Sequence, residues 1–478
     1  MKEQKHIHFV GIKGVGVAPL AIIAKEVGFT VSGSDIVDGF ITDVILKKAG
    51  IIPLVGFEEM HVVGADLVIT TGAHGGYDNE EVVYAKKNGI PVITQGEAVG
   101  KFMNGEILGA HDTIGISVTG THGKTTTTAL IAKILKDAHA DPSWVIGTSE
   151  IPSLGSGGHF GKGQYFVAEA DEYANEPVYD KTPKLLLQYP KIAVITNIEH
   201  DHPDVYATVD EVRKTFLQFA NHLPKDGFLV TCGDDMQVQT LLKEFSGKVS
   251  TYGFSERNMF CIKNVSKSSE GISWNIMSEG KTVSLSMSVP GEHNAFNATA
   301  AYIVAMHCGV SDEDIKKSLL TFSGTKRRLE YVGQLPSGAL LYDDYAHHPT
   351  EIQKTLDALK EKYPSKRIIC VFQPHTYSRT KLLFDQFIDS LAISDEIIMS
   401  DIYSSKREAY DSTVSSAMLV ERLFQYKPVI LAKTLQDVVK YINQHHYGDE
   451  SVIVTMGAGD IYTVANQILE HGSAPVVS

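Results

Sequence analysis

Short apolar segments alternate along the chain with longer amphipathic ones. Segments rich in Val, Ile and Leu at 6–10, 29–34, 67–70 and 91–94 predict short buried strands. The stretches between them carry apolar residues at helical spacing. Strands and helices in alternation are typical of a parallel α/β fold, in which helices cover both faces of the sheet.

The alternation resumes twice farther along the chain. Strands are predicted at 113–119, 165–168 and 192–196, while the segment 254–289 alternates apolar and polar residues, which favours antiparallel strands. A third series of strands and helices runs from 339 to 469. The whole chain is therefore expected to be α/β, built from three successive series of elements.

Chain length indicates that these series are separate domains. The chain has 478 residues, whereas single hydrophobic cores stop growing at about 250–300 residues. Weakly periodic residues at 103–112 and a polar, basic segment at 323–328 separate the series. The predicted domains are a Rossmann-like N-terminal domain (1–110), a central P-loop ATPase-like α/β domain (111–323) and a C-terminal Rossmann-like α/β domain (324–478).

Charge and cysteine content exclude several classes of protein. The formal net charge is -14, which opposes long-range attraction to nucleic acid or to an anionic membrane surface. The four cysteines lie far apart without a Cys-x-x-Cys pair, which argues against a disulfide framework or a zinc cluster. Apolar runs end well short of the ~20 residues that cross a bilayer, and no signal region opens the sequence. We expect a cytoplasmic enzyme without nucleic-acid or membrane partners.

The strongest chemical signal is a glycine loop between a strand and a helix. The predicted strand 113–119 runs into Gly-Thr-His-Gly-Lys-Thr-Thr, and apolar residues at helical spacing follow. In such loops backbone N–H groups approach phosphate oxygens, the lysine meets the terminal phosphates and the hydroxyl ligates magnesium. Val118 replaces the first glycine of the Walker pattern, so this is a shorter variant. The predicted ATP-binding loop comprises Gly120, Thr121, His122, Gly123, Lys124, Thr125 and Thr126.

Carboxylates follow two of the predicted central strands. Glu169 comes directly after the strand 165–168, and the segment 197–202 follows the strand 192–196. Carboxyl ends of parallel strands are where ligands bind, and Mg²⁺ prefers hard oxygen ligands. Acidic loop tips are often only solvated surface, but their position beside a phosphate loop favours a metal site, with Glu169 as the preferred ligand.

A second glycine loop follows the first strand. Gly11, Gly14 and Gly16 are followed by Ser34 and Asp35, which close the second strand about 20 residues later, as in a dinucleotide-binding unit. Lys13 breaks the regular G-x-G-x-x-G spacing, so a tight turn without a ligand is the alternative. Backbone donors at a helix start suit any diphosphate, so a nucleotide-diphosphate substrate fits as well as NAD.

Polar loops also follow the predicted strands of the third domain. Arg327 and Arg328 lie at its junction with the central domain, where a closing domain could bring a guanidinium onto a transferring phosphoryl group. Loops at 343–349 and 372–379 are dense in polar residues. Arg379 is a natural carboxylate clamp because its planar fork can bind both oxygens at once.

Six ordered motifs together resemble the Mur ligase family over nearly the whole length. They are Gly-Thr-His-Gly-Lys-Thr (120–125), Glu-Ala-Asp-Glu (169–172), Pro-Gly-Glu-His-Asn-Ala-Phe-Asn (290–297), Lys-Arg-Arg (326–328), Asp-Asp-Tyr-Ala-His-His-Pro-Thr-Glu (343–351) and Phe-Gln-Pro-His-Thr-Tyr-Ser-Arg-Thr (372–380). The resemblance implies an ATP-dependent enzyme that builds the peptide of the bacterial cell-wall precursor. A substrate carboxylate would attack the γ-phosphate of ATP, and an amine would then attack the acyl phosphate.

The resemblance also implies substrates and residue roles. The motifs are most similar to members that join L-alanine to UDP-N-acetylmuramate, with ATP and Mg²⁺, acting as a monomer or homodimer. Implied catalytic residues are Lys124, Glu169, His202, Arg328 and His348; implied metal ligands are Thr125, Glu169 and His202. Further implied contacts of ATP are His293, Asn294, Asn297, Arg327, Arg328 and Asp344. The implied contacts of the UDP-sugar are Gly11, Gly14, Gly16, Ser34 and Asp35. The implied contacts of the amino acid are His348, His375, Tyr377 and Arg379.

Some residues depart from the family pattern and leave alternatives open. Lys13 and Gln95 stand where the family usually has glycine and arginine. Tyr173 and the segment 179–181 are more similar to members that attach a recycled murein tripeptide to the same UDP-sugar. A non-catalytic nucleotide-binding relative is a further alternative, whereas a P-loop kinase or an NAD-dependent oxidoreductase would leave several motifs unexplained.

Overall fold

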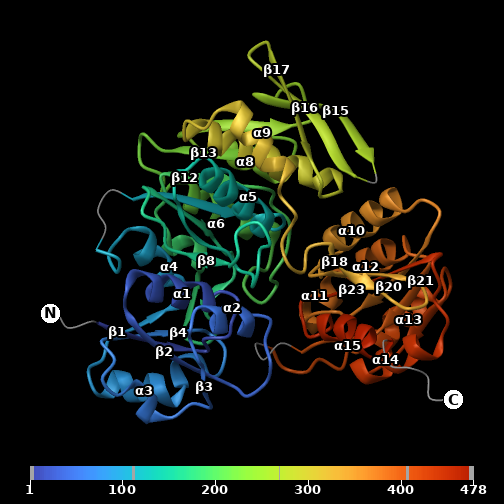
Figure 1. Cartoon of the computed structure of the whole chain (residues 1–478), viewed down its shortest axis with the longest axis horizontal. Helices are drawn as coiled ribbons and strands as arrows, with labels where there is room; N and C mark the ends of the chain where they lie inside the picture. The colour runs from blue at the N-terminus through green and yellow to red at the C-terminus, as the bar shows by residue number, and fades with distance from the viewer. Residues whose placement is uncertain (1–4, 110–112, 269, 405–407, 473–478) are drawn as a thin grey trace.

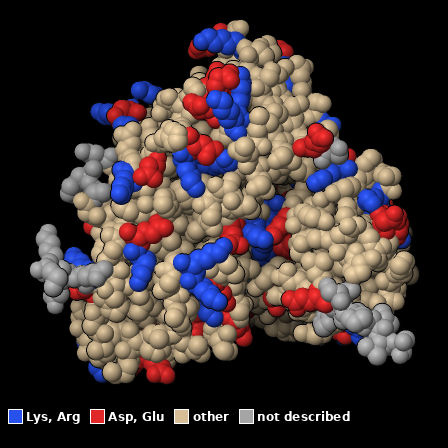
Figure 2. All heavy atoms as spheres, in the orientation of Figure 1, with Lys and Arg blue, Asp and Glu red and all other residues tan. Residues whose placement is uncertain are grey.

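A computed structural model describes residues 5–109, 113–268, 270–404 and 408–472 (Figure 1). It contains three α/β domains, each built around its own main sheet. Figure 2 shows a hollow where the three domains meet, with acidic and basic side chains gathered along it. Among the described helices, none combines the length and hydropathy needed to cross a membrane.

The N-terminal sheet is parallel, with strand order β3-β2-β1-β4-β5. This order is that of a Rossmann unit, which places loops at the carboxyl ends of β1 and β4 on either side of the switch point. Its strands are β1 (His6–Val10), β2 (Thr30–Asp35), β3 (Leu54–Val55), β4 (Leu67–Thr70) and β5 (Val92–Thr94). Its helices are α1 (Ala18–Val27), α2 (Asp43–Lys48), α3 (Glu80–Lys87) and α4 (Gln95–Met103), with 3-10 turns at Glu59–Val62 and Gly76–Asp78.

The central sheet has ten strands in the order β17-β16-β15-β14-β13-β12-β6-β9-β7-β8. Its parallel part comprises β6 (Ile114–Thr119), β7 (Ser143–Val145), β9 (Tyr165–Glu169), β12 (Ile192–Ile195), β13 (Phe228–Cys232) and β14 (Lys248–Gly253), with β8 (Gly158–His159) antiparallel at one edge. At the other edge, β15 (Phe260–Ser268), β16 (Gly271–Ser278) and β17 (Lys281–Met287) form the predicted antiparallel meander. A separate hairpin joins β10 (Ala174–Glu176) and β11 (Asp180–Pro183).

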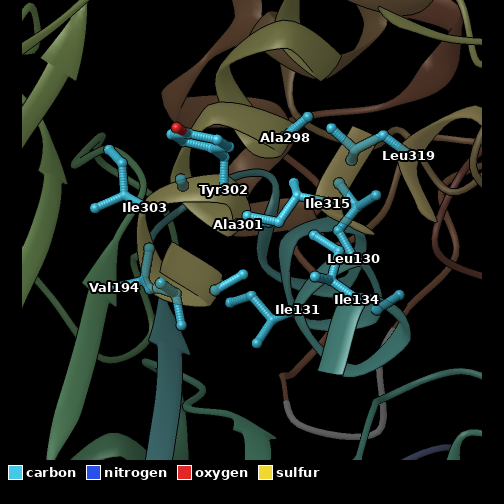
Figure 3. Close-up of a cluster of buried hydrophobic side chains, with 14 of the residues drawn as sticks. Leu130, Ile131, Ile134, Val194, Ala298, Ala301, Tyr302, Ile303, Ile315 and Leu319 are labelled. Atoms are coloured by element: carbon cyan, nitrogen blue, oxygen red, sulfur yellow. The ribbon is translucent and has the colours of Figure 1, made fainter. Parts of the chain in front are cut away.

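Two buried helices anchor the central sheet. Helix α5 (Lys124–Asp137) places Leu130, Ile131 and Ile134 against α8 (Glu292–His307), whose small residues Ala298 and Ala301 allow close approach (Figure 3). The remaining helices of this domain are α6 (Val209–Ala220), α7 (Met236–Leu242) and α9 (Asp312–Leu320), with a 3-10 turn at Lys184–Leu187. Because α5 begins at the phosphate loop and α8 at the 290–297 motif, this packing brings both motifs to one side of the sheet.

The C-terminal sheet has strand order β18-β19-β23-β20-β21-β22, with only β18 antiparallel. Its strands are β18 (Glu330–Gln334), β19 (Leu340–Asp344), β20 (Arg367–Phe372), β21 (Glu396–Met399), β22 (Val429–Leu431) and β23 (Ser451–Met456). Its helices are α10 (Pro349–Lys362), α11 (Tyr377–Leu382), α12 (Phe384–Leu391), α13 (Ser416–Leu423), α14 (Leu435–Gln444) and α15 (Tyr462–Gly472).

The two interfaces of the central domain differ in chemistry. Phe9 and Phe102 of the N-terminal domain share one buried apolar cluster with Val145 and Phe166 of the central domain. The buried apolar clusters of the described C-terminal domain contain its own residues alone. It meets the central domain through polar pairs, among them Lys267–Glu361, Glu199–Thr350 and Asp201–Arg379.

The predicted domain boundaries stay predictions. The boundary near residue 110 lies outside the described residues. The boundary near residue 324 falls at Gly324, between α9 and β18, where φ is +88°. A glycine adopts this left-handed conformation without the steric cost that other residues meet.

A buried polar network stabilises the N-terminal domain around Glu81. The carboxylate accepts hydrogen bonds from Ser34 Oγ and lies 3.2 Å from His8 Nε2 and 2.7 Å from His61 Nδ1. Replacing Glu81 with alanine is expected to lower the free energy of unfolding by about 3 kcal/mol, because several buried donors lose their shared acceptor. Urea unfolding followed by circular dichroism measures this loss, and Glu80→Ala, at an exposed neighbour, is the matched control.

The Glu81 contribution should depend on pH. Burial alone would raise the pKa of Glu81, but hydrogen bonds from His8 and Ser34 outweigh it and lower the pKa below the ordinary 4.5. A lowered carboxyl pKa gives stability that is present above pH 4.5 and lost as pH falls through the folded pKa. The difference between wild type and Glu81→Ala should therefore shrink below pH 4.5; a constant difference down to pH ~3 would contradict this account.

Candidate active site

The phosphate loop lies between β6 and α5, as predicted. Gly120 and Gly123 have φ values of +135° and +82°. A Cβ atom at Gly120 would lie 1.9 Å from Thr196 Oγ1, and one at Gly123 would lie 2.4 Å from Asn297 Oδ1. Glycine is therefore required at both positions for conformation and for space. The Lys124 backbone begins α5, so the loop presents a helix N-terminus.

Lys124 is held at the centre of this loop as a cation. Its Nζ donates to the Gly120 carbonyl at 2.7 Å and lies 2.9 Å from a Glu172 carboxylate oxygen. Burial alone would lower the pKa of Lys124, but Glu172 and Asp171 raise it above the ordinary value. The ammonium group is thus kept charged beside the backbone that would receive phosphate.

The residues around Glu169 fit a divalent cation. Thr125 Oγ1 donates to Glu169 Oε2 at 3.1 Å, so the predicted hydroxyl and carboxylate ligands are in contact. Burial, together with the nearby Asp171 carboxylate, raises the pKa of Glu169 to about 7. A buried carboxylate in this environment gains from a bound cation, and its oxygen donors suit Mg²⁺.

The predicted ligand His202 lies in a second group of donor atoms. His202 Nε2 lies 3.5 Å from Glu172 Oε1 and 3.7 Å from Asp201 Oδ2. Ligand atoms of these three residues lie within 4.8 Å of one another, as a metal site requires. Lys124 and His202 share Glu172, which connects this group to the phosphate loop.

A cavity of about 420 Å³ opens beside the phosphate loop, between the central and C-terminal domains. The predicted nucleotide-binding residues that line it are His122, Gly123, Thr125, Thr126, His293, Asn294, Asn297, Arg328 and Asp344. Burial, with help from Lys354, lowers the pKa of His293 to about 4, so its ring is neutral at pH 7. Phe254 and Phe296 also line the cavity and offer flat apolar surface for a base.

The structure separates the two arginines of the Lys-Arg-Arg motif. Arg328 lines the cavity, and its Nη1 donates to Glu351 Oε1 at 3.4 Å. Arg327 is buried elsewhere: its Nε donates to Asp343 at 3.1 Å and its Nη2 to the Gly457 carbonyl at 2.6 Å. Of the two candidates, Arg328 alone is placed to meet a nucleotide in this cavity.

The residues predicted to bind the amino-acid substrate do not all lie together. Arg379 and His375 are in contact, with Arg379 Nη1 donating to the His375 carbonyl at 3.2 Å. The His348 ring lies instead against His122, with ring centroids 4.7 Å apart. Tyr377 packs edge-on against Tyr410, 5.4 Å between centroids. His375 and Arg379 therefore lie together, while His348 faces the phosphate loop.

Arg379 already binds a carboxylate of the central domain. Its Nε donates to Asp201 Oδ1 at 2.7 Å, and both side chains are nearly inaccessible to solvent. Burial alone would raise the pKa of Asp201, but Arg379 holds it well below the ordinary value. This buried pair joins two domains next to the predicted metal ligand His202.

In the N-terminal domain, Asp35 organises the first glycine loop. It accepts a hydrogen bond from the Lys13 backbone N–H at 2.7 Å, while Gly11 takes φ +74° in the tight turn before α1. The Lys13 side chain folds back to donate to the Ile36 carbonyl at 3.0 Å. Lys13 thus stabilises the loop although it breaks the expected glycine spacing.

The other residues predicted to bind the UDP-sugar are Gly14, Gly16 and Ser34, and they differ in whether they are available to a ligand. Gly14 and Gly16 lie in the turn that enters α1, and a Cβ atom at Gly16 would lie 3.2 Å from Gln95 Nε2. Ser34 is fully buried and donates to Glu81, so its hydroxyl is used inside the domain.

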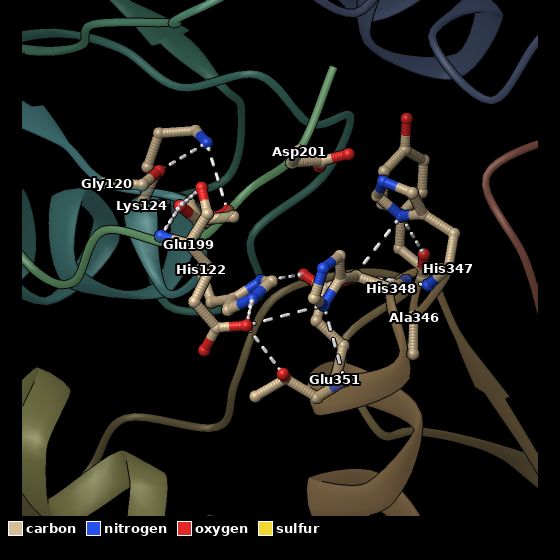
Figure 4. A network of polar contacts seen from close by, with 12 residues as sticks. Gly120, His122, Lys124, Glu199, Asp201, Ala346, His347, His348 and Glu351 are labelled. Carbon is tan, nitrogen blue, oxygen red and sulfur yellow. Dashed lines mark hydrogen bonds and ion pairs between the residues drawn. The ribbon is translucent and has the colours of Figure 1, made fainter. Parts of the chain in front are cut away.

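Two carboxylates that the sequence motifs did not single out connect the domains around His122 (Figure 4). His122 Nε2 lies 3.4 Å from Glu199, and Nδ1 lies 3.3 Å from Glu351 of the C-terminal domain. Burial alone would lower the pKa of His122, but the nearby Glu199 and Glu351 carboxylates raise it to about 10. Glu351 is the last residue of the 343–351 motif and Glu199 lies in the segment 197–202, but their partners are distant in sequence.

Comparison with known proteins gives consistent matches along the chain. Residues 6–106 match the Mur ligase family catalytic domain, 118–305 the Mur ligase middle domain and 327–459 the Mur ligase glutamate ligase domain. A UDP-N-acetylmuramate–L-alanine ligase of Caldanaerobacter subterraneus subsp. tengcongensis is 40% identical, with 98% of each chain covered. The protein of that name from Alkaliphilus metalliredigens is 37% identical over 98% of this chain and 97% of its own.

Solved structures agree with these matches. The UDP-N-acetylmuramate–alanine ligase of Thermotoga maritima superposes with a TM-score of 0.81 and 27% identity, covering 98% of this chain and 99% of that one. A murein peptide ligase of Psychrobacter arcticus has the same fold, with a TM-score of 0.75, 24% identity and coverage of 99% and 100%. The chain belongs to the Mur ligase family.

Proposed function

We propose that this enzyme joins L-alanine to UDP-N-acetylmuramate at the expense of ATP, in the cytoplasmic synthesis of the peptidoglycan precursor. The observation that carries the proposal is the convergence of the phosphate loop, the 290–297 motif and Arg328 on one cavity. Full-length relatives at 36–40% identity that carry the name of this ligase support the choice of substrates.

In the first step, the lactyl carboxylate of the UDP-sugar attacks the γ-phosphorus of ATP; the bond from this phosphorus to ADP breaks, and the products are an acyl phosphate and ADP. Arg328 lines the cavity, and Lys124 lies in the phosphate loop beside it, paired with Glu172; together they would balance the charge of the transferring phosphoryl group. Thr125 and Glu169 in one group of donor atoms, and His202 in the other, would hold Mg²⁺, which supplies further charge neutralisation when bound.

In the second step, the amine of L-alanine attacks the acyl carbon, and inorganic phosphate leaves. We place the amino-acid carboxylate at Arg379, beside His375. Burial, with help from His122, lowers the pKa of His348 to about 4, so this ring is neutral at pH 7. Its Nδ1 accepts from the Thr350 backbone, which leaves Nε2–H as a donor for a substrate oxygen.

We place the UDP moiety at the N-terminal domain. The turn that contains Gly11, Gly14 and Gly16 precedes the first turn of α1, where backbone N–H groups can meet a diphosphate. The Asp35 carboxylate, next to this turn, is the group nearest to a ribose in the analogous dinucleotide unit. Substrate carboxylate and ATP would then meet in the hollow between the domains.

Phosphate release in the presence of magnesium, ATP and UDP-N-acetylmuramate tests the proposal. We expect release with L-alanine, weaker release with glycine or L-serine, and none when the UDP-sugar is omitted. D-alanine is the matched control for the stereochemistry of the acceptor. Release only with L-alanyl-γ-D-glutamyl-meso-diaminopimelate would make this a recycling ligase, and no release with any acceptor would favour a non-catalytic relative.

A further inference from the structure

Glu351 occupies an unusual position in the first turn of α10. Its Oε1 lies 3.3 Å from His122 Nδ1 and 3.4 Å from Arg328 Nη1, and its Oε2 lies 3.3 Å from His347 Nδ1. The same carboxylate completes the capping box with His348 at the start of the helix. One side chain thus meets three basic groups and the end of its own helix.

The three basic partners belong to different parts of the proposed reaction centre. His122 lies in the phosphate loop of the central domain, and Arg328 lines the nucleotide cavity. The His347 ring lies 5.9 Å from the ring of His375, the neighbour of Arg379. Glu351 therefore contacts both the phosphate side and the amino-acid side of the centre (Figure 4).

Charge explains why this arrangement depends on domain closure. Burial alone would raise the pKa of Glu351, but His347 and His122 hold it well below the ordinary value, so it is an anion. His122 belongs to the central domain, so this partner is present only when the two domains are together. Burial lowers the pKa of His347 to about 4, so the cations beside Glu351 at pH 7 are His122 and Arg328. An unpaired buried carboxylate is costly, whereas a carboxylate between these two cations is stabilised.

We propose that Glu351 is a positioning residue that brings the phosphate-loop His122 and Arg328 into their reactive places when the C-terminal domain closes. The proposal rests on the ligase reaction proposed above and adds a coupling between closure and phosphoryl transfer. Glu351 acts through its neighbours: it attracts Arg328 into the cavity and holds His122, and thereby the loop beside Lys124, against the closed domain.

Glu351→Gln separates this role from helix capping. The amide oxygen still accepts hydrogen bonds from the backbone of the first turn, while the negative charge that attracts the basic groups is lost. We expect kcat for phosphate release to fall by about 100-fold, since a small displacement of reacting groups has an effect of this size. Glu351 itself lines the cavity, but a carboxylate repels the anionic phosphates of ADP and adds no affinity of its own. ADP affinity, measured by calorimetry, should therefore stay within about threefold, because the adenine stretch and loop glycines are untouched.

The matched control is Glu361→Gln. Glu361 lies on the same helix and also bridges to the central domain, because its carboxylate accepts a hydrogen bond from Lys267 Nζ at 2.7 Å. Unlike Glu351, it is not paired with His122, Arg328 or His347. This partly exposed pair should change kcat by no more than about twofold. A general loosening of the interface would affect both variants, whereas positioning affects Glu351→Gln alone.

A double-mutant cycle with His122→Gln tests the route of the effect. If Glu351 acts through His122, the double variant should be about as slow as the slower single variant, and not slower by the product of both effects. Glu351→Asp keeps the charge on a shorter side chain and should recover about tenfold of the lost rate. Thermal melting shows whether Glu351→Gln folds; if it does not, the kcat of Glu351→Asp is compared with that of wild type instead.

The outcomes are distinct. An inactive wild type would overturn the proposed function itself. With an active wild type, the role of Glu351 is supported by a loss of kcat at retained ADP affinity together with non-additivity in the cycle. It is overturned if Glu351→Gln keeps its kcat within threefold, if kcat and ADP affinity fall together, or if the two substitutions prove independent.

Discussion

Replacing Lys124 with alanine is expected to lower kcat for ADP release by about 1000-fold or more, with the fold retained. Lys124 Nζ is fixed by the Gly120 carbonyl and Glu172, and it is the one described ammonium group held inside the loop. Its removal would leave Arg328, the helix N-terminus and bound Mg²⁺ to neutralise the charge of the phosphate groups. Coupled ADP-release kinetics measure the loss, and circular dichroism checks the fold.

Lys136→Ala is the matched control for this substitution. Lys136 lies on the same helix, α5, but is exposed near its other end. We expect its kcat to equal that of wild type within about twofold, as for most surface substitutions. Turnover retained by Lys124→Ala would remove this residue from the reaction, whatever the control shows.

Replacing Arg379 with alanine is expected to raise the KM for L-alanine by about 100-fold, because charge-assisted hydrogen bonds to a carboxylate are lost. The loss has a second source in this structure. Asp201 would remain buried without its partner at 2.7 Å and would repel the incoming carboxylate. Initial rates at varied L-alanine and saturating ATP separate KM from kcat.

Two further variants define the origin of the Arg379 effect. Arg379→Lys keeps the charge but not the planar fork, so its KM should lie between those of wild type and Arg379→Ala. Lys381→Ala, on the same helix but exposed and paired with Asp411, should leave KM unchanged. An unaltered KM in Arg379→Ala would place the substrate carboxylate elsewhere.

The elements that carry the site could be predicted because their signals are local. The strands at 6–10 and 67–70 have the predicted bounds, and the glycine loop at 120–123 lies between a strand and a helix as expected. Residues at strand ends, such as Glu169, the last residue of β9, reach one edge of the sheet because parallel strands align there. The antiparallel meander at 260–287 was also visible as an alternation of apolar and polar residues.

The pairings inside the site could not be predicted in this way. Asp201 and Arg379 are 178 positions apart, and nothing in either motif indicates that the Arg379 Nε donates to the Asp201 carboxylate. Arg327 and Arg328 are adjacent and chemically equal, so only the fold decides that the first is buried on Asp343. Likewise, Ser34 donates to Glu81, which lies 47 positions away on α3, and the strand pattern around Ser34 does not indicate this partner.

Because the two interfaces of the central domain differ, we expect the N-terminal and central domains to move as one unit and the C-terminal domain as another. The N-terminal and central domains share an apolar cluster, which salt does not screen, whereas the C-terminal domain is held by ion pairs and hydrogen bonds. Ionic attraction is screened over about 8 Å at physiological salt. Rising ionic strength is therefore expected to weaken the exposed pairs of the C-terminal domain, such as Lys267–Glu361, more than the buried Asp201–Arg379 pair, and to leave the apolar contact of the other two domains unchanged.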